Sequence, residues 1–133
     1  MTPRETYERI INSITDMDTR KLAREMSYHV GKDNRITKAE LIIFMFGKVS
    51  DTNDRKVRLI VSDLVTNYHY PICTLSGVGG YWLAETRDEA IESAQDIESR
   101  IPDMVDRAKA LRMCDLPAVL PEQRAAALQG SLL

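Results

Sequence analysis

The sequence predicts a mainly helical protein that contains one small β-hairpin. Apolar residues recur every three or four positions in several segments before residue 70, a spacing typical of amphipathic helices. Residues 71–84 interrupt that spacing with two short apolar runs, ICTL and YWLA, which the glycine-rich segment SGVGG joins. A further helical region follows from about residue 85 to 113. At 133 residues, the chain is long enough for one domain with an extended terminus.

Two helices are expected before residue 31. The first, TPRETYERIINSI, has Thr2 as its N-cap and Pro3 at its first position. Its apolar residues have helical spacing, at Tyr7, Ile10, Ile11 and Ile14. The second helix, DTRKLAREMSYHV, repeats the pattern through Leu22, Met26 and Val30, before the glycine and turn formers of GKDNR.

Two more helices are expected, at 37–46 and 53–68. Thr37 and Glu40 have the spacing of a capping box, and Gly47 ends the first of these helices. The N-cap candidates of the second are Ser50, Asp51, Thr52 and Asn53. At about 100° per residue, one face of this helix is apolar and carries Val57, Ile60, Val61, Leu64 and Tyr68. The opposite face carries Arg55, Leu59, Ser62 and Thr66, with Lys56 and Arg58 beside them.

The glycine cluster at residues 77–80 has two interpretations. A dinucleotide-type phosphate loop is followed by a helix, whose N-terminus meets the phosphate. Here the strand-like YWLA follows, and no Lys-Ser or Lys-Thr pair stands after the glycines. We therefore predict the turn of a hairpin, in which glycines permit positive φ. Strand alternation places Trp82 on the opposite face from Tyr81 and Leu83, under the helix that follows.

The net charge of −2 conceals a basic middle segment. Residues 19–84 carry 10 Lys and Arg against 6 Asp and Glu. The flanking segments are acidic, with 2 against 4 in residues 1–18 and 6 against 10 in residues 85–133. The middle segment can therefore attract a polyanion although the whole chain is slightly negative.

Several classes of function are not expected. No apolar run reaches 18 residues and the start is charged, so we expect no membrane span, no signal peptide and a cytoplasmic location. Cys73 and Cys114 lack CxxC spacing, and His29 and His69 form no HExxH pair, so we expect no metal and no cofactor. No nucleophile and base stand at a catalytic spacing, and we do not expect an enzyme.

Three short patterns follow one another between Lys21 and Ala84. They have the form S-x-x-x-V-R-x-x-I-x-x-L, then P-I, then G-G-Y-x-L-A, and the matching residues are Thr52, Val57, Arg58, Ile60 or Val61, Leu64, Pro71, Ile72, Gly79, Gly80, Tyr81, Leu83 and Ala84. In this order and spacing the stretch resembles the winged helix-turn-helix domains of small bacterial and phage DNA-binding proteins. The resemblance covers about half of the chain. It implies a supporting helix at 37–46, a recognition helix at 53–68 and a wing at 72–84.

The resemblance implies a protein that binds double-stranded DNA, as a transcriptional regulator or a phage-type replication accessory factor. A recognition helix fits the major groove, where arginines and hydroxyl groups read base edges while lysines contact phosphates. The predicted DNA-binding residues are Lys38, Lys48, Asn53, Arg55, Lys56, Arg58, Ser62 and Thr66.

A winged-helix protein-interaction module, an adaptor or inhibitor that does not bind DNA, is the alternative. Leu59 lies in the middle of the reading face, where it can contact a thymine methyl group or dock on a protein. The wing tip at 76–79 has no Lys or Arg. Winged helices serve both purposes, so the fold alone does not decide between them.

The region 85–114 is expected to form a homodimer through helices. Thr86 and Glu89 have the spacing of another capping box. An apolar stripe begins at Ala90, and its predicted dimer contacts are Ala94, Ile97, Ile101, Met104, Ala108 and Leu111. Packing of the stripe on its own domain is the alternative. Pro102 predicts a kink or break close to residue 101.

These features divide the chain into four predicted parts. They are an N-terminal helix at 1–18, the winged helix-turn-helix domain at 19–84, the dimerisation segment at 85–114 and a tail at 115–133. The tail contains PEQRAAALQ, a helix-prone sequence that suggests a docked or partner-binding segment.

Overall fold

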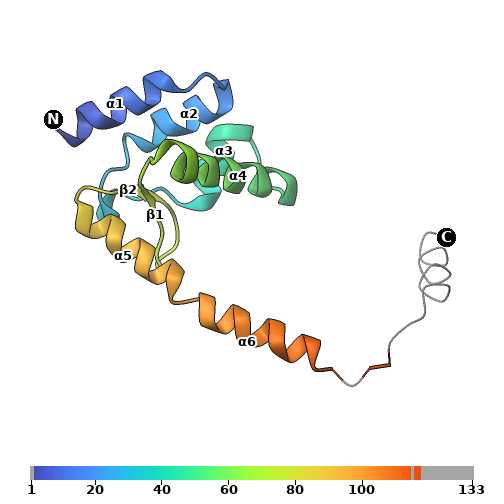
Figure 1. The fold of residues 1–133 in the computed structure, drawn as a ribbon. Coiled ribbons are helices and arrows are strands. Elements are labelled where there is room, and N and C mark those ends of the chain that lie inside the picture. Colours follow the sequence, from blue (N-terminus) through green and yellow to red (C-terminus); the bar gives the residue numbers. More distant parts are fainter. Residues whose placement is uncertain (1, 115, 118–133) are drawn as a thin grey trace, which may run out of the picture. The chain divides into compact units, whose positions relative to one another are not determined.

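A computed structural model describes residues 2–114 and 116–117 of the chain (Figure 1). The chain divides into two compact units, Met1–Ser99 and Arg100–Leu133. The first unit holds most of the secondary structure, which is mainly helical with one small antiparallel sheet. Its elements are α1 (Pro3–Ser13), α2 (Met17–Met26), the 3-10 turn η1 (Lys32–Asn34), α3 (Lys38–Phe46), α4 (Asp51–Tyr68), β1 (Ile72–Cys73), β2 (Trp82–Leu83) and α5 (Arg87–Glu98). The second unit contains α6 (Ile101–Arg112), and the helix-prone sequence predicted in the tail lies outside the described residues.

Reciprocal capping boxes start three of these helices. At α1, the Thr2 hydroxyl accepts a hydrogen bond from the Glu5 backbone N–H, and the Glu5 carboxylate accepts one from the Thr2 N–H. Thr37 begins α3 and Thr86 begins α5 with the same reciprocal pair of bonds. Each box satisfies backbone donors that have no partner within the helix. The predicted capping boxes are therefore confirmed.

The helix α2 is shorter than the sequence predicts, since it ends at Met26 and not at Val30. The backbone of the next residues pairs with β2 instead. His29 accepts a hydrogen bond from the Leu83 N–H at 2.8 Å, and the Gly31 N–H donates to the Leu83 carbonyl at 2.9 Å. Because these groups bond to a strand, they cannot also continue the helix, and tertiary pairing overrides the apolar periodicity.

The sheet consists of two antiparallel strands, with Ile72 paired with Leu83 and Cys73 paired with Trp82. The segment between α2 and α3 adds two isolated bridges to the same hairpin, one from Val30 to Leu83 and one from Ile36 to Tyr81. The glycine cluster lies in the connection between β1 and β2, as predicted, and its three glycines, at 77, 79 and 80, have positive φ.

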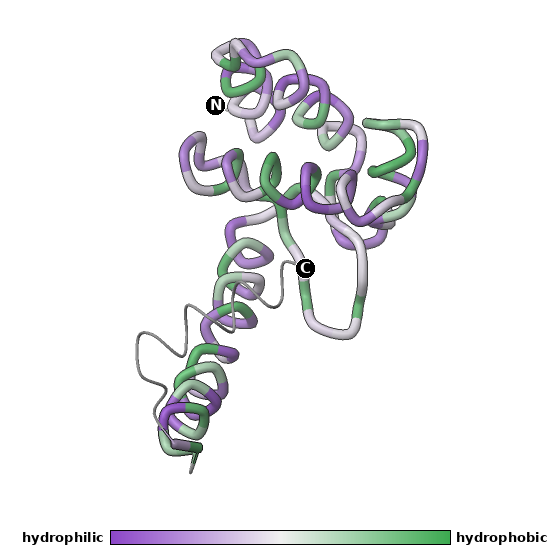
Figure 2. Tube along the Cα trace, turned by 90° about the vertical axis from the view of Figure 1, so that its right-hand side faces the viewer, coloured by the Kyte–Doolittle hydropathy of each residue, from purple (hydrophilic) through white to green (hydrophobic). Residues whose placement is uncertain are grey.

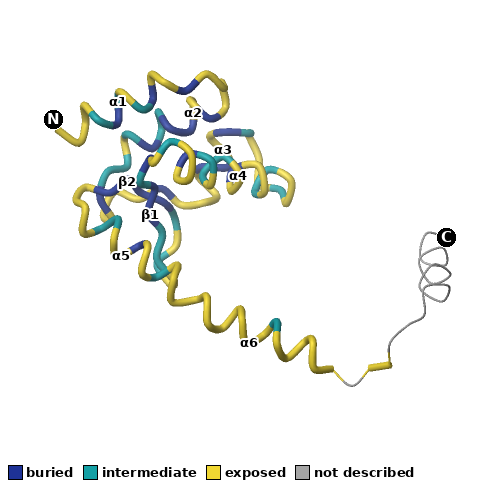
Figure 3. Tube along the Cα trace, viewed as in Figure 1, coloured by how far each residue is buried: buried dark blue, intermediate teal, exposed yellow. Residues whose placement is uncertain are grey.

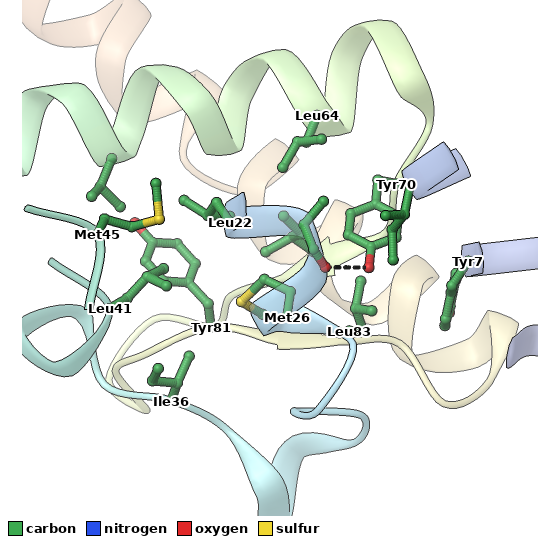
Figure 4. Packing of buried hydrophobic residues seen from close by; sticks show 14 of the residues in the cluster. Tyr7, Leu22, Met26, Ile36, Leu41, Met45, Leu64, Tyr70, Tyr81 and Leu83 are labelled. Atoms are coloured by element: carbon green, nitrogen blue, oxygen red, sulfur yellow. Dashed lines mark hydrogen bonds between the residues drawn. The ribbon is translucent and has the colours of Figure 1, made fainter. Parts of the chain in front are cut away.

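The core lies between α1, α2, α3, α4 and the inner face of the hairpin (Figure 4). Tyr70, at the end of α4, is fully buried, and its hydroxyl donates to the Ala23 carbonyl of α2 at 2.8 Å. Its ring meets the ring of Tyr7 edge to face, with 5.5 Å between centroids. The Tyr7 hydroxyl in turn donates to the Ala84 carbonyl. These bonds satisfy the polar ends of two buried aromatic rings and join α1, α2 and the strand end.

A second apolar cluster covers the outer face of the hairpin. Trp82 is 2% exposed and packs with Cys73 and Ala90 of α5, whereas Tyr81 and Leu83 belong to the main core. The predicted alternation of the strand is confirmed. Residues of α5 also bind the hairpin loop: the Ser93 hydroxyl accepts from the Thr74 N–H and donates to its carbonyl, and the Asp96 carboxylate accepts from the Ser76 N–H. The first compact unit therefore extends to Ser99 because α5 packs on the hairpin.

The helical region after the hairpin is broken, as Pro102 predicts. The helix α5 ends at Glu98 and α6 begins at Ile101, with Pro102 in its first turn. Proline has no N–H to bond the carbonyl four residues earlier, that of Glu98, so a continuous helix would lose this bond. Nearly every described residue of α6 is exposed (Figure 3), although green apolar and purple polar segments alternate along it (Figure 2).

Candidate nucleic-acid interface

The helix α4 is held at both ends and presents one face to solvent. The Ser50 hydroxyl caps its start by accepting from the Asn53 N–H at 3.1 Å, and His69 ends it with a φ of 54°. Four residues, 47–50, connect it to α3, and Gly47 begins the connection in the left-handed conformation. Val57 and Leu64 are fully buried on the inner face.

The outer face of α4 carries the residues that the periodicity predicts. Arg55, Leu59, Ser62 and Thr66 are all exposed, and the side chain of Leu59 is 59% exposed. Within the part of the chain that the structure describes, Arg55 makes no ion pair or side-chain hydrogen bond. Its guanidinium is therefore available to a ligand, beside two hydroxyl groups and one apolar side chain.

Asp54 brings two of the predicted DNA-binding cations together. Its carboxylate lies 2.9 Å from the Nζ of Lys38 and 3.0 Å from the Nε of Arg58. The hydrogen bond from Lys38, followed by the charges of Lys38 and Arg58, holds the pKa of Asp54 below its usual range. Asp54 was not predicted to be part of the site. The i,i+4 spacing to Arg58 is a local signal for that pair, whereas the contact with Lys38 of α3 has no local signal.

Other predicted DNA-binding residues also have partners within the protein. The Asn53 side-chain amide donates to the Lys48 carbonyl at 2.9 Å, so it stabilises the turn before α4. The ammonium of Lys56 lies 5.2 Å from the ring centroid of Phe46, in a cation–π contact. Lys48 itself is exposed beside this turn. The predicted set therefore divides into exposed residues on α4 and in the turn before it, and residues that contact neighbouring groups of the protein.

A cation that the prediction did not include lies over a second aromatic ring of α3. The Nζ of Lys21, on α2, is 5.0 Å from the ring centroid of Phe44, which is 41% exposed. Exposed apolar residues continue from there to Ile43 and Val49. The residues around the end of α3 are thus basic and apolar together, a composition that suits either nucleic acid or a protein partner.

The tip of the hairpin contributes little charge. Ser76, Gly77 and Gly79 are exposed, and the backbone and hydroxyl of Ser76 are bonded to Asp96 of α5. A side chain added at Gly77 or Gly79 would meet no atom within 4 Å. The tip is therefore open enough for close approach to another molecule.

The predicted dimerisation residues are mostly exposed. On α5, Ala94 is exposed and Ile97 is 52% exposed. On α6, Ala108 is half-buried, and the other members are open to solvent, with exposures of 54% for Ile101, 64% for Met104 and 75% for Leu111. Ala90, at the start of the stripe, packs against the Trp82 cluster and so belongs to its own domain.

Three further observations on the described residues concern metal ligands, the buried thiol and helix length. No group of three or more His, Cys, Asp or Glu in the described chain is arranged to hold a metal ion. Burial, followed by the nearby charges of Glu89 and Glu92, raises the pKa of the Cys73 thiol to about 11, which makes it a poor nucleophile. None of the described helices has the length and apolar character needed to cross a membrane.

Comparisons of the chain with models of known protein families, with curated proteins and with solved structures found no match.

Proposed function

We propose that this chain binds double-stranded DNA as a winged helix-turn-helix protein, either a transcriptional regulator or a phage-type replication accessory factor, and that α4 reads the major groove. The arrangement of α3 and α4 supports this proposal, because two helices joined by a short turn containing glycine are typical of the helix-turn-helix motif. A two-stranded hairpin follows α4, and in this proposal it is the wing.

The outer face of α4 is the observation that carries the proposal. The guanidinium of Arg55 has no partner among the residues that the structure describes, and it can bind the O6 and N7 of a guanine with two hydrogen bonds. Ser62 and Thr66 lie about two and three helical turns beyond Arg55 on the same face, and their hydroxyl groups can meet other base edges. Leu59, between Arg55 and Ser62, suits a thymine methyl group.

In the proposal, the lysines around this face contact the DNA backbone. Lys48 and Lys56 lie near the start of α4 and would contact phosphates, which position the protein without reading sequence. Lys38 and Arg58 share the Asp54 carboxylate, which offsets part of their positive charge. We further propose that the chain is a homodimer, in which the exposed apolar residues of α5 and α6 hold two copies at a fixed half-site spacing.

The test is a fluorescence-anisotropy titration with random and genomic duplex DNA at about 50 and 200 mM salt, a range over which phosphate contacts reveal themselves. We expect binding that weakens steeply with salt. Arg55→Ala should weaken it about 10-fold or more, since one bidentate contact is worth about 1–3 kcal/mol. Arg9→Ala, which removes an exposed arginine of α1, is the matched control and should change affinity less than about twofold. An equal loss of DNA affinity in Arg55→Ala and Arg9→Ala would contradict the proposal that the outer face of α4 reads the bases.

Docking on a protein partner is the second candidate, and the exposure of Leu59 favours it. A leucine that is 59% exposed in the centre of a polar face is a natural anchor for a hydrophobic contact. Leu59→Asp should then abolish the partner's binding, whereas the double variant Arg55→Ala, Arg58→Ala should have a smaller effect. The reverse order of sensitivity, measured with duplex DNA, supports DNA binding. A folded protein that binds no DNA at the lower salt would favour this second candidate.

A further inference from the structure

An open apolar groove lies on the first compact unit, between α4, the start of β1 and α5. Its volume is about 280 Å³, and it is lined mainly by Val65, Pro71, Ala90, Ala94 and Ile97. Val65 is 39% exposed and Ile97 is 52% exposed, so two branched apolar side chains border it in contact with water. Two residues of the predicted dimerisation stripe, Ala94 and Ile97, thus belong to a groove and not to a simple helix ridge.

The second compact unit offers a helix face that lacks a cover in the described chain. Apolar residues of α6 recur at spacings of three and four residues, at Ile101, Met104, Val105, Ala108 and Leu111. Val105 is 45% exposed and Leu111 is 75% exposed. A helix of 12 residues is marginal in water by itself, and most helical stability in proteins comes from packing of one face. The face of α6 therefore needs a surface to pack on.

The charges of the two helices are complementary. The helix α5 carries five acidic residues and one arginine, whereas α6 carries two acidic residues and three basic ones. Two copies that paired α5 with α5 would place one strongly acidic helix against another. Pairing α5 of one copy with α6 of a second copy places opposite net charges together, and this arrangement is the favourable one.

We infer that α6 of one copy packs into the α4–α5 groove of a second copy, and that the second copy returns the same contact. This inference rests on the homodimer of the proposed function and specifies which surfaces form it. The two contacts are related by twofold symmetry, as in most homodimers. Each copy would bury six large apolar side chains in the two contacts, two from its groove and four from its α6. At about 100 Å² each, they bury on the order of 600 Å² of surface per copy, close to the ~800 Å² per partner of a stable interface. Flanking charged stems supply the rest.

The first arm of the test measures the association of the full chain by sedimentation equilibrium, without DNA. Ile97→Asp alters the groove and Leu111→Asp alters the α6 face, and each should raise the dimer dissociation constant at least tenfold. Met17→Asp is the matched control, because Met17 is 85% exposed on α2, outside both surfaces, and this variant should dimerise like the wild type. Circular dichroism checks that all three variants are folded.

The second arm identifies which helices meet. Lys109 is the sole lysine of α6, and α5 has none, so a zero-length carbodiimide cross-link from Lys109 to an α5 carboxylate reports this contact. The experiment uses an equilibrated mixture of isotopically light and heavy protein. We expect cross-linked peptides that combine one light and one heavy chain. Cross-links confined to chains of one isotope would mean that α6 packs within its own molecule, and they would overturn the inference.

The outcomes separate this contact from the proposed function. A dimer that persists in both the groove and the α6 variants overturns the contact but leaves a homodimer that uses another surface. A monomeric wild-type protein overturns the contact and the dimer together. Neither result bears on DNA binding by α4, which the anisotropy titration measures independently.

Discussion

Gly80 is the residue whose replacement tests the packing of the hairpin most sharply. Its φ is +78°, and a Cβ built there would lie 2.5 Å from the carbonyl oxygen of Ile36. That carbonyl accepts a hydrogen bond from the Tyr81 N–H, and the Ile36 N–H donates to the Tyr81 carbonyl, both at 2.9 Å. Gly80→Ala therefore places a methyl group against the pair of bonds that fixes the hairpin to the segment before α3.

The expected cost follows from these two contributions. A Cβ at positive φ costs about 1–2 kcal/mol. Relief of the clash requires the bridge between Ile36 and Tyr81 to open, and each lost backbone hydrogen bond costs about 0.5–1.5 kcal/mol. Alanine also restricts the unfolded chain, which returns about 0.4–1 kcal/mol. We expect Gly80→Ala to lower the free energy of unfolding by about 1–5 kcal/mol, a large share of the ~5–15 kcal/mol that a typical domain has.

Urea denaturation followed by the fluorescence of Trp82 measures this change, because Trp82 is the single tryptophan and is buried beside the altered bridge. Gly79→Ala is the matched control. Gly79 has a φ of +77°, and a Cβ there would meet no atom within 4 Å, so only the cost of the backbone conformation, about 1 kcal/mol, is expected. An equal loss of unfolding free energy in Gly80→Ala and Gly79→Ala would refute the argument that a Cβ at residue 80 clashes with the Ile36 carbonyl.

Three further predictions concern charge and the two cysteines. Asp54→Asn removes one negative charge and releases Lys38 and Arg58 from the carboxylate that they share. The affinity of the variant for random duplex DNA should therefore rise several-fold and depend more steeply on salt. A titration that matches the wild type would mean that these cations do not contact DNA. Cys73 has a pKa raised to about 11 from 9.0, so the folded protein keeps this proton at a pH where the unfolded chain loses it. Stability from this group is therefore complete below about pH 9 and is lost as pH rises toward 11. The urea midpoint should fall between pH 8.5 and about pH 10.5, less so in Cys73→Ala. At pH 8, a thiol reagent should modify the exposed Cys114 quickly and Cys73 only after unfolding.

The candidate site was predictable in its geometry but not in its electrostatics. Helical periodicity places Arg55, Ser62 and Thr66 on one outer face, because side-chain direction along a helix depends only on position in the sequence. Which cations are free on that face depends on neighbours from other elements. Lys38 reaches Asp54 from α3, and a pattern within α4 contains no information about that contact.

The sequence by itself determined the features that depend on bonds between near neighbours. Thr37 and Thr86 cap their helices through residues three positions away, and Pro102 breaks the last helical region through a bond that spans four residues. Alternation along the strand was sufficient to predict that Trp82 lies on the outer face of the hairpin, opposite Tyr81 and Leu83.

Only the tertiary structure decided the features that depend on distant segments. The helix α2 ends at Met26 because the backbone beyond it bonds to Leu83, far along the chain, and these bonds compete with the helix for the same groups. Gly80 must be glycine because the carbonyl of Ile36 comes against it. Local propensity is weak and is overridden wherever a buried backbone group finds its partner in another element, since leaving that group unpaired costs more than a turn of helix gains.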